Sequence, residues 1–351
     1  MTTNNPPLER VDGCPPVRPA AQGSPLASAP VSGPEVSLVE PNTSSSAVTP
    51  DSCSPSRPVG PRTGSRIGSK QRGRLRGELV QRDWRVLESL AQHRFLSSHQ
   101  VEAFHFSADF VAGPVASASA RAARRTLSRL HARGVIQLLD GRRVGGLAGG
   151  STISIWYLTD AGYRLIRDGT SRYRIGVPTA RFLGHTLAIA DAHLAVLAAA
   201  QALAGTSSVQ VEKQALRQMP GLGGGAVTLA PDLHVQLSAT DQAGAYEDRW
   251  FMEVDCGTES LPTLLRKCEQ YETYYRSGIE QAGGDDDCAV GSSTTGSPFP
   301  LVLWIFHGPR AEARLAQLRS RVSRSQRLTP ELFRYATPSK LPEILRTGGA
   351  L

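Results

Sequence analysis

The 351-residue sequence is poor in cysteine, and its five cysteines form no CxxC pair. Disulfide frameworks and structural zinc sites need paired or closely spaced ligands, so we expect neither. The chain does not open with a basic segment followed by an apolar one, and we expect no secretory signal. These absences are typical of a cytoplasmic protein whose thiols are reduced.

An uninterrupted apolar run is also missing. The most apolar stretch, residues 185–205, is broken by His185, Asp191 and His193. A bilayer span needs about 20 predominantly apolar residues, so this stretch is expected to be a core helix. We therefore predict no membrane association.

Large apolar side chains are scarce in residues 1–79, which are rich in proline, serine and glycine. Such a segment buries too little surface to offset the entropy of ordering it, so we predict a disordered tail. Its end, residues 57–76, carries seven basic residues and no acid. This end is either a solvated linker or an arm along DNA phosphates, and the sequence leaves both interpretations open.

Excess positive charge is confined to one region. Residues 57–145 hold 17 Lys and Arg against 6 Asp and Glu, residues 1–56 hold 2 against 5, and residues 146–351 hold 20 against 20. The differences of +11, −3 and 0 account for the formal net charge of +8. A concentrated basic region indicates a polyanionic partner, and double-stranded DNA is the one we expect.

Residues 80–169 carry the pattern of a winged helix-turn-helix domain that binds DNA. The predicted elements are a helix capped by Asp83, a helix with an S-x-x-Q capping box at Ser97 and Gln100, a helix ending at Gly134, strands at 135–139 and 151–158, and a helix capped by Thr159. A glycine-rich hairpin joins the two strands and forms the expected wing.

The third of these helices has an apolar side and an arginine side. By the 3.6-residue period, Ala123, Leu127 and Leu130 lie together and the arginines lie opposite. The residues predicted to bind DNA, on this helix and the wing, are Arg121, Arg124, Arg125, Arg129, Arg142 and Arg143. An arginine-coated bundle that binds nothing is the alternative, but a basic helix joined to a basic wing favours binding in the major groove.

Residues 180–325 are predicted to form a mixed α/β domain of ordinary size, followed by a C-terminal tail over 326–351. The expected elements are a helix at 183–204, strands at 208–216, 229–237 and 249–255, a helix at 260–275, a strand at 300–307 and a helix ending near Ser323.

Two successive strands of this domain carry acids at their ends. Asp232 belongs to one strand, and Glu253 and Asp255 lie two positions apart on the next, so they share a face. Converged carboxylates repel unless a cation neutralises them, and hard oxygen ligands suit Mg²⁺ or Mn²⁺. We predict that Asp232, Glu253 and Asp255 bind such an ion; the alternative is a solvated strand end.

This arrangement resembles the PD-(D/E)xK nuclease superfamily, which has a restriction-endonuclease-like α/β core. The resemblance implies that Asp232 and Glu253 match its metal-binding acids. Asp255 stands where the motif has its lysine, and Lys267 on the following helix is the candidate substitute, because some members carry the lysine there. Asp232, Glu253, Asp255 and Lys267 are therefore the catalytic candidates for metal-dependent DNA cleavage.

Two residues beside these candidates keep two interpretations each. His185 opens the first helix of the domain and either approaches the acids or serves as a capping or core histidine. Glu212 is either a further ligand or an exposed strand carboxylate.

The predicted winged helix, followed by EVDCGTES and a helix containing KCEQYETYY, resembles the replication-relaxation family of bacterial plasmid- and mobile-element proteins, over roughly residues 80–325. The resemblance implies a role in replication or relaxation of plasmid DNA, with replication or mobilisation proteins as partners. Three functions stay open: an endonuclease that nicks DNA, a non-enzymatic initiator or transcriptional regulator with a degenerate second domain, and a DNA-binding subunit for a separate transposase or helicase.

Overall fold

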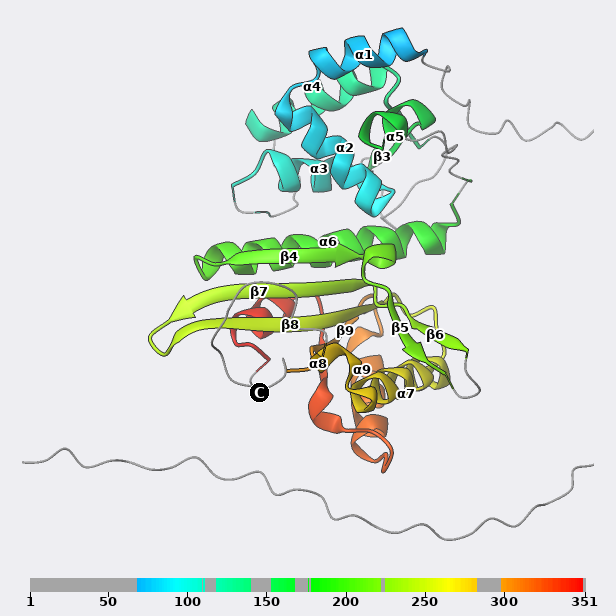
Figure 1. The fold of residues 1–351 in the computed structure, drawn as a ribbon, viewed down its shortest axis with the longest axis vertical. Coiled ribbons are helices and arrows are strands. Elements are labelled where there is room, and N and C mark those ends of the chain that lie inside the picture. Colours follow the sequence, from blue (N-terminus) through cyan, green and yellow to red (C-terminus); the bar gives the residue numbers. More distant parts are fainter. Residues whose placement is uncertain are drawn as a thin grey trace, which may run out of the picture. The chain divides into compact units, whose positions relative to one another are not determined.

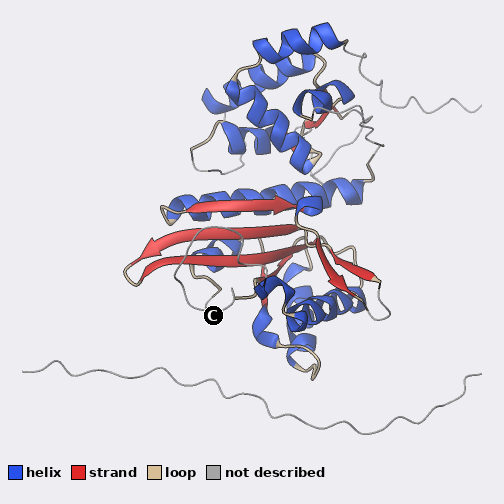
Figure 2. Cartoon of the chain, in the orientation of Figure 1, coloured by secondary structure: helices blue, strands red, loops and turns tan. Residues whose placement is uncertain are grey.

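The structure, a computed structural model, describes residues 68–108, 110, 118–139, 153–167, 176, 178–221, 225–282 and 298–349. All of them belong to one unit, Pro58–Leu351. Helices and sheets are both present, which confirms the predicted mixed α/β class (Figures 1 and 2). Residues 1–67 of the predicted tail and the hairpin predicted as a wing lie outside the described residues.

A mainly helical part comes first. Its elements are α1 (Ser69–Glu78), α2 (Gln81–His93), β1 (Leu96–Ser97), α3 (Ser98–His105), α4 (Ala118–Ala132), β2 (Ile136–Leu138), β3 (Ile155–Leu158) and α5 (Asp160–Ile166). The three short strands form an antiparallel sheet in the order β1-β3-β2. This order of helices and strands agrees with the order expected from the sequence, while the winged helix-turn-helix assignment itself stays a prediction.

Local sequence signals explain most of these boundaries. The capping box of α3 is formed, because Ser97 accepts from the Gln100 amide at 3.1 Å and Gln100 accepts from the Ser97 amide at 3.0 Å. Thr159 caps α5 by accepting from the Gly162 amide. Asp83, predicted as a cap, instead lies inside α2 and accepts from the Val80 amide at 3.2 Å. Gly134 has the positive φ of 70° expected after a helix end.

The predicted tail extends too far, because α1 begins at Ser69. Leu75 and Leu79 are 5% and 7% exposed and join the core formed by α2, α4 and α5. Two leucines four residues apart lie on the same side of a helix, and they are sufficient to attach α1 to this core although the rest of it is polar. The residues between and just before these leucines are charged or glycine, so the sequence lacks the repeated apolar positions that would predict a helix.

The second part of the chain is a sheet covered by helices on both faces. Its elements are α6 (Ala180–Ala202), β4 (Thr206–Val211), the 3₁₀ turn η1 (Glu212–Gln214), β5 (Arg217–Pro220), β6 (Ala226–Leu229), β7 (Leu233–Asp241), β8 (Gly244–Asp255), α7 (Leu261–Ser277), α8 (Ile279–Ala282), β9 (Leu301–Phe306), α9 (Ala311–Ser323), η2 (Pro330–Leu332), β10 (Phe333–Ala336) and α10 (Leu341–Arg346).

The five-stranded sheet has the order β10-β9-β8-β7-β4. Strands β4, β7 and β8 pair antiparallel, whereas β8, β9 and β10 run parallel. The short hairpin β5-β6, which the sequence did not reveal, forms a separate two-stranded sheet. The restriction-endonuclease-like assignment of this part stays a prediction.

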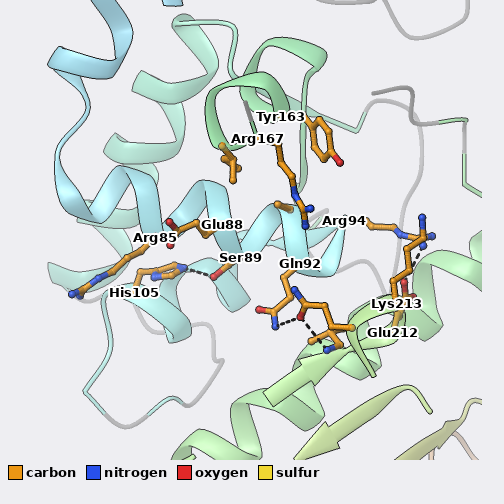
Figure 3. Close-up of a pocket in the computed structure, with 14 residues that line it drawn as sticks. Arg85, Glu88, Ser89, Gln92, Arg94, His105, Tyr163, Arg167, Glu212 and Lys213 are labelled. Carbon is orange, nitrogen blue, oxygen red and sulfur yellow. Dashed lines mark hydrogen bonds and ion pairs between the residues drawn. The ribbon is translucent and has the colours of Figure 1, made fainter. Parts of the chain in front are cut away.

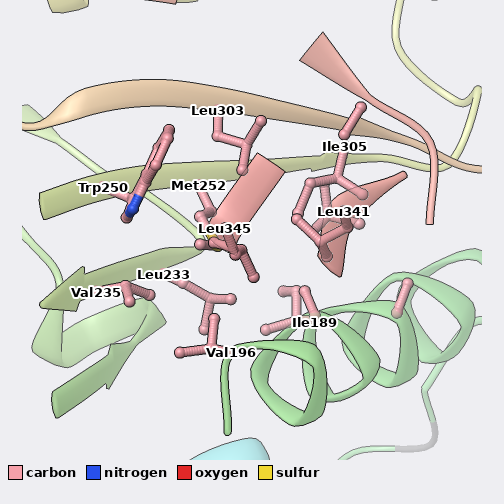
Figure 4. Close-up of a cluster of buried hydrophobic side chains, with 14 of the residues drawn as sticks. Ile189, Val196, Leu233, Val235, Trp250, Met252, Leu303, Ile305, Leu341 and Leu345 are labelled. Atoms are coloured by element: carbon pink, nitrogen blue, oxygen red, sulfur yellow. The ribbon is translucent and has the colours of Figure 1, made fainter. Parts of the chain in front are cut away.

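The second half of β8, from Trp250, is buried on both faces because both faces of the sheet are covered there. Trp250, Met252 and Val254 face a core shared with α6 and α10 (Figure 4). Phe251 faces the opposite core, formed with α7 and α9. By the same alternation, Glu253 and Asp255 lie on the face that α7 and α9 cover.

The C-terminal tail predicted for residues 326–351 is wrong, because this segment completes the fold. Strand β10 extends the sheet by pairing with β9, and α10 inserts Leu341 and Leu345, 2% and 0% exposed, into the core beside α6. Both elements are short, so their hydrophobic periodicity is too brief to identify from sequence.

Helix α6 is long and apolar enough to cross a membrane by length and composition, but 61% of its apolar window is buried within the fold. It packs against β7 and α10, as the sequence predicted for a core helix. The cytoplasmic location stays a prediction.

Candidate functional site

The carboxylates predicted on two strands come together where β7 begins and β8 ends. The two strands are antiparallel neighbours, with Leu233 opposite Met252. Asp232 donates its amide to the Met252 carbonyl at 3.1 Å and accepts the Val254 amide on Oδ2 at 2.8 Å. The pairing of β7 with β8 thus brings Asp232 beside Glu253.

Glu253 is 1% exposed and binds two side chains of α7. Lys267 donates to Oε2 and Tyr271 donates to Oε1. Residues four apart on a helix lie on the same side, so α7 presents both donors to one carboxyl group. The structure therefore places Lys267 beside the acids, as the sequence expected, and it adds Tyr271 as a second donor.

Burial and opposing charges set the protonation of this pair. Burial raises the pKa of Glu253 to about 8, against the lowering effect of the Lys267 ammonium. Burial also disfavours the charged form of Lys267, but the carboxyl groups of Glu253 and Asp232 raise its pKa above the usual value. The lysine is thus held as a cation, and its side chain remains 26% exposed.

His185, near the start of α6, approaches the acids. Its Nε2 donates to Oδ1 of Asp232 at 3.2 Å. Burial works against its charged form, but the bonds to Asp232 and Cys256 raise the pKa of His185 to about 10. Burial alone would raise the pKa of Asp232, and the bond to His185 together with the charge of Lys267 holds it below its usual value.

Asp255 has a different set of partners. Arg314 of α9 donates Nε to Oδ2 at 2.6 Å, and the Gly257 amide donates to Oδ1 at 3.0 Å. Arg314 also donates to the Glu259 carbonyl at 2.8 Å. Asp255 therefore joins the loop after β8 to α9. Sequence reasoning missed Arg314, because a partner 59 residues away leaves no local signal.

His307 is a further residue that the sequence did not single out. It follows β9, and its amide donates to the Asp255 carbonyl at 2.8 Å. Burial lowers the pKa of His307, and the nearby charge of His185 acts in the same direction. Its buried Nε2 has no hydrogen-bond partner among the described residues. Glu212, in contrast, pairs with Arg94 at 3.1 Å and is not joined to the acids.

Asp232 and Glu253 supply the hard carboxylate oxygens that Mg²⁺ or Mn²⁺ prefers. Asp255 binds Arg314 and the Gly257 amide through its two oxygens, and Asp232 and Glu253 likewise accept a hydrogen bond on each oxygen. Within the described part of the chain, no group of three or more His, Cys, Asp or Glu residues is arranged to hold a metal ion. A divalent ion at Asp232 and Glu253 would therefore have to displace donors that these acids already bind.

The predicted DNA-binding arginines of α4 lie on its exposed side. Arg121, Arg124, Arg125 and Arg129 are exposed, while the opposite side of the helix is buried. Arg129 forms an ion pair with Asp83, which is 1% exposed. No described residue bonds to the other three guanidinium groups. Arg142 and Arg143, predicted on the wing, lie outside the described residues.

The family model described as Replication-relaxation matches residues 87–285, more than half of the 351-residue chain. No curated protein and no solved structure matches. The matched region begins in α2 and continues through α4, Asp232 and strand β7. It also contains Glu253 and Asp255 on β8 and Lys267 on α7. The chain belongs to the replication-relaxation family.

Proposed function

We propose that this protein binds plasmid or mobile-element DNA through α4 and acts on that DNA at the site formed by Asp232, Glu253 and Lys267. Membership of the replication-relaxation family suggests a role in replication or relaxation of such DNA. The observation that carries the nuclease part is the contact of Lys267 with Glu253, which supplies a lysine where the β8 motif has Asp255.

The DNA-binding part rests on the charge of α4. Its arginines project from a helix whose other side is anchored in the core by Ala123, Leu127 and Leu130. Exposed guanidinium groups without protein partners are suited to phosphate oxygens and to guanine edges in the major groove. In this proposal the part of the chain from α2 to α5 is the winged helix-turn-helix that contacts the duplex.

The cleavage part rests on what the buried cluster can do. Lys267 carries a positive charge beside the carboxyl groups and remains partly exposed, so it can stabilise the charge that develops on a phosphate. A divalent ion on Asp232 and Glu253 would polarise the phosphodiester and lower the pKa of a bound water. His185 holds Asp232 in place through the 3.2 Å bond to Oδ1. Asp255 and Arg314 fix the loop after β8.

The second candidate is a non-enzymatic initiator or regulator. Each carboxyl group of the cluster already accepts hydrogen bonds from the protein on both oxygens: Asp232 from His185 and Val254, Glu253 from Lys267 and Tyr271, Asp255 from Arg314 and Gly257. A closed network of this kind stabilises a fold without metal, and it favours a second part that serves as an interaction module.

Two assays on the full chain separate these functions. For binding, the double variant Arg121→Gln/Arg125→Gln should weaken duplex binding and reduce the slope of log K against log salt by roughly 0.9 for each DNA phosphate that is no longer neutralised. The control Arg319→Gln/Arg321→Gln removes the same charge from exposed positions of α9 and should leave both quantities unchanged. Equal effects in the two variants would exclude α4 as the DNA-binding surface.

For cleavage, supercoiled plasmid is incubated with the protein and Mg²⁺ or Mn²⁺. We expect nicking that is lost in Lys267→Met, with duplex binding and the melting temperature retained, because the Glu253 carboxyl group can stay protonated when the ammonium is removed. The absence of metal-dependent nicking in the wild type, with duplex binding intact, would reject the nuclease and leave the non-enzymatic initiator or regulator.

A further inference from the structure

A cavity of about 540 Å³ lies where α2, α5 and η1 meet (Figure 3). This volume falls within the range of small-molecule sites, about 300–1,000 Å³. Four cationic side chains line it, against two acidic ones, Glu88 and Glu212. The cations are Arg85, Arg94, Arg167 and Lys213. The lining is thus net positive, and it includes no residue of the carboxylate cluster or of α4.

Most of this positive charge is available to a ligand. Arg94 is paired with Glu212 at 3.1 Å. Arg85, Arg167 and Lys213 are exposed, and none of the described residues forms a hydrogen bond or ion pair with them. They come from three different elements around one space (Figure 3). His105, also in the lining, adds no charge at neutral pH, because burial and the nearby Arg85 lower its pKa to about 4.

The wall between α2 and η1 is held in an unusual backbone conformation. Arg94 and Glu212, which form the ion pair, have positive φ angles of 65° and 43°. Such conformations cost a non-glycine residue on the order of 1–3 kcal/mol and persist where surrounding contacts impose them. Gln92 adds such a contact, donating Nε2 to the Val209 carbonyl at 3.1 Å. The cavity is therefore a built feature of the fold.

We propose that this cavity binds the phosphate groups of a nucleotide, either free or within a DNA strand. Guanidinium groups bind phosphate through paired hydrogen bonds, and the Lys213 ammonium adds a point charge. Tyr163 and Ile166 give the lining an apolar side suited to a sugar or base. The proposal does not depend on the cleavage of DNA.

The test measures binding to the full chain by titration calorimetry with two probes, deoxyadenosine triphosphate and a short DNA duplex. The variant Arg167→Gln/Lys213→Gln removes two cations of the cavity, and Arg319→Gln/Arg321→Gln is the control of equal charge. Hydrogen bonds to charged groups contribute about 1.5–3 kcal/mol each, so the cavity variant should raise Kd at least about tenfold. The control should leave Kd unchanged.

The two probes distinguish the sources of phosphate. If the cavity variant loses the binding of deoxyadenosine triphosphate that the wild type shows, the ligand of the cavity is a free nucleotide. If it loses only duplex binding, the ligand is the DNA backbone. Arg121→Gln/Arg125→Gln should leave triphosphate binding intact, which separates this site from the DNA-binding surface on α4. If the double variant unfolds, Arg85→Gln replaces it, since Arg85 is exposed and without a described partner. Unchanged affinity for both probes, or an equal weakening in the control, would overturn the proposal.

Discussion

The arginine side of α4 and the carboxylate cluster at the end of β8 both gather ionisable side chains of one kind, but they do so in opposite environments. On α4, Arg121, Arg124 and Arg125 are exposed and bond to no described residue. In the cluster, Glu253 and Asp255 are 1% and 3% exposed, and every carboxyl oxygen accepts a hydrogen bond.

This difference follows from what solvent does for a charge. Water screens the exposed arginines from one another, so they need no protein partner and remain available to a polyanion. A buried carboxyl group loses that solvation and must find protein donors or stay protonated. Arg121, Arg124 and Arg125 can therefore be removed without damage to the fold, whereas the cluster is part of the fold and any ligand there must replace existing bonds.

The buried histidines of α2 and α6 extend this comparison to groups with no counter-charge. His93 Nε2 and His193 Nδ1 lie 3.0 Å apart. Burial lowers the pKa of His93 to about 3, with a further contribution from His193, and lowers that of His193 to about 4. In the unfolded chain both histidines titrate near pH 6.5. The unfolded state therefore binds more protons than the folded state at pH values from about 6.5 down to the lowered pKa values.

The contribution of this pair to stability should therefore fall as the pH falls below about 6.5. Between pH 7 and pH 4.5 the pair should lower the free energy of unfolding by on the order of 5 kcal/mol. Because the pKa values of Glu253 and His105 are also shifted, the contribution is measured by urea denaturation at a series of pH values as the difference between the wild type and His93→Gln/His193→Gln. The same pH dependence in the wild type and in the double variant would show that the pair is not kept neutral by burial.

Removal of the central acid of the cluster should have the next largest effect. Glu253→Ala leaves Lys267 and Tyr271 without their acceptor in a buried setting, and breaking a buried pair in this way costs about 3–5 kcal/mol. Glu269→Ala on the exposed side of the same helix is the control and should change stability by less than about 0.5 kcal/mol. Urea denaturation at pH 7 measures both. Similar losses of unfolding free energy in the two variants would mean that the cluster is solvated, like the arginines of α4.

The smallest expected effect distinguishes arginines of α4 that stabilise the fold from those that bind DNA. Arg129 pairs with the buried Asp83, so Arg129→Gln should lower the free energy of unfolding by about 1–2 kcal/mol. Arg125→Gln should leave stability unchanged and reduce duplex affinity instead. Thermal denaturation of each variant measures the effect on stability, and a salt titration of DNA binding measures the effect on duplex affinity. A lower stability in Arg125→Gln would indicate a structural role for the whole arginine side.

Sequence patterns predicted the long elements well. The apolar stripe of α4, the capping boxes, the buried strand β8 and the helix α7 depend on residues a few positions apart, so their signals are local. Short elements were not predicted from the sequence. Helices α1 and α10 each depend on two buried leucines, and β10 has four residues. Such elements form only because a core made by distant segments receives them.

The sequence by itself determined the mixed α/β class, the two opposite sides of α4, and the placement of Asp232 beside β7 and of Glu253 on β8. Only the tertiary structure decided which cation neutralises each acid: Lys267 for Glu253, His185 for Asp232 and Arg314 for Asp255. It also decided that Arg94 and Glu212 meet beside a cationic cavity. Periodicity fixes which side of an element a residue occupies, but pairing across many residues depends on how strands and helices pack, because a charge buried by packing is stabilised by whichever partner that packing brings within reach.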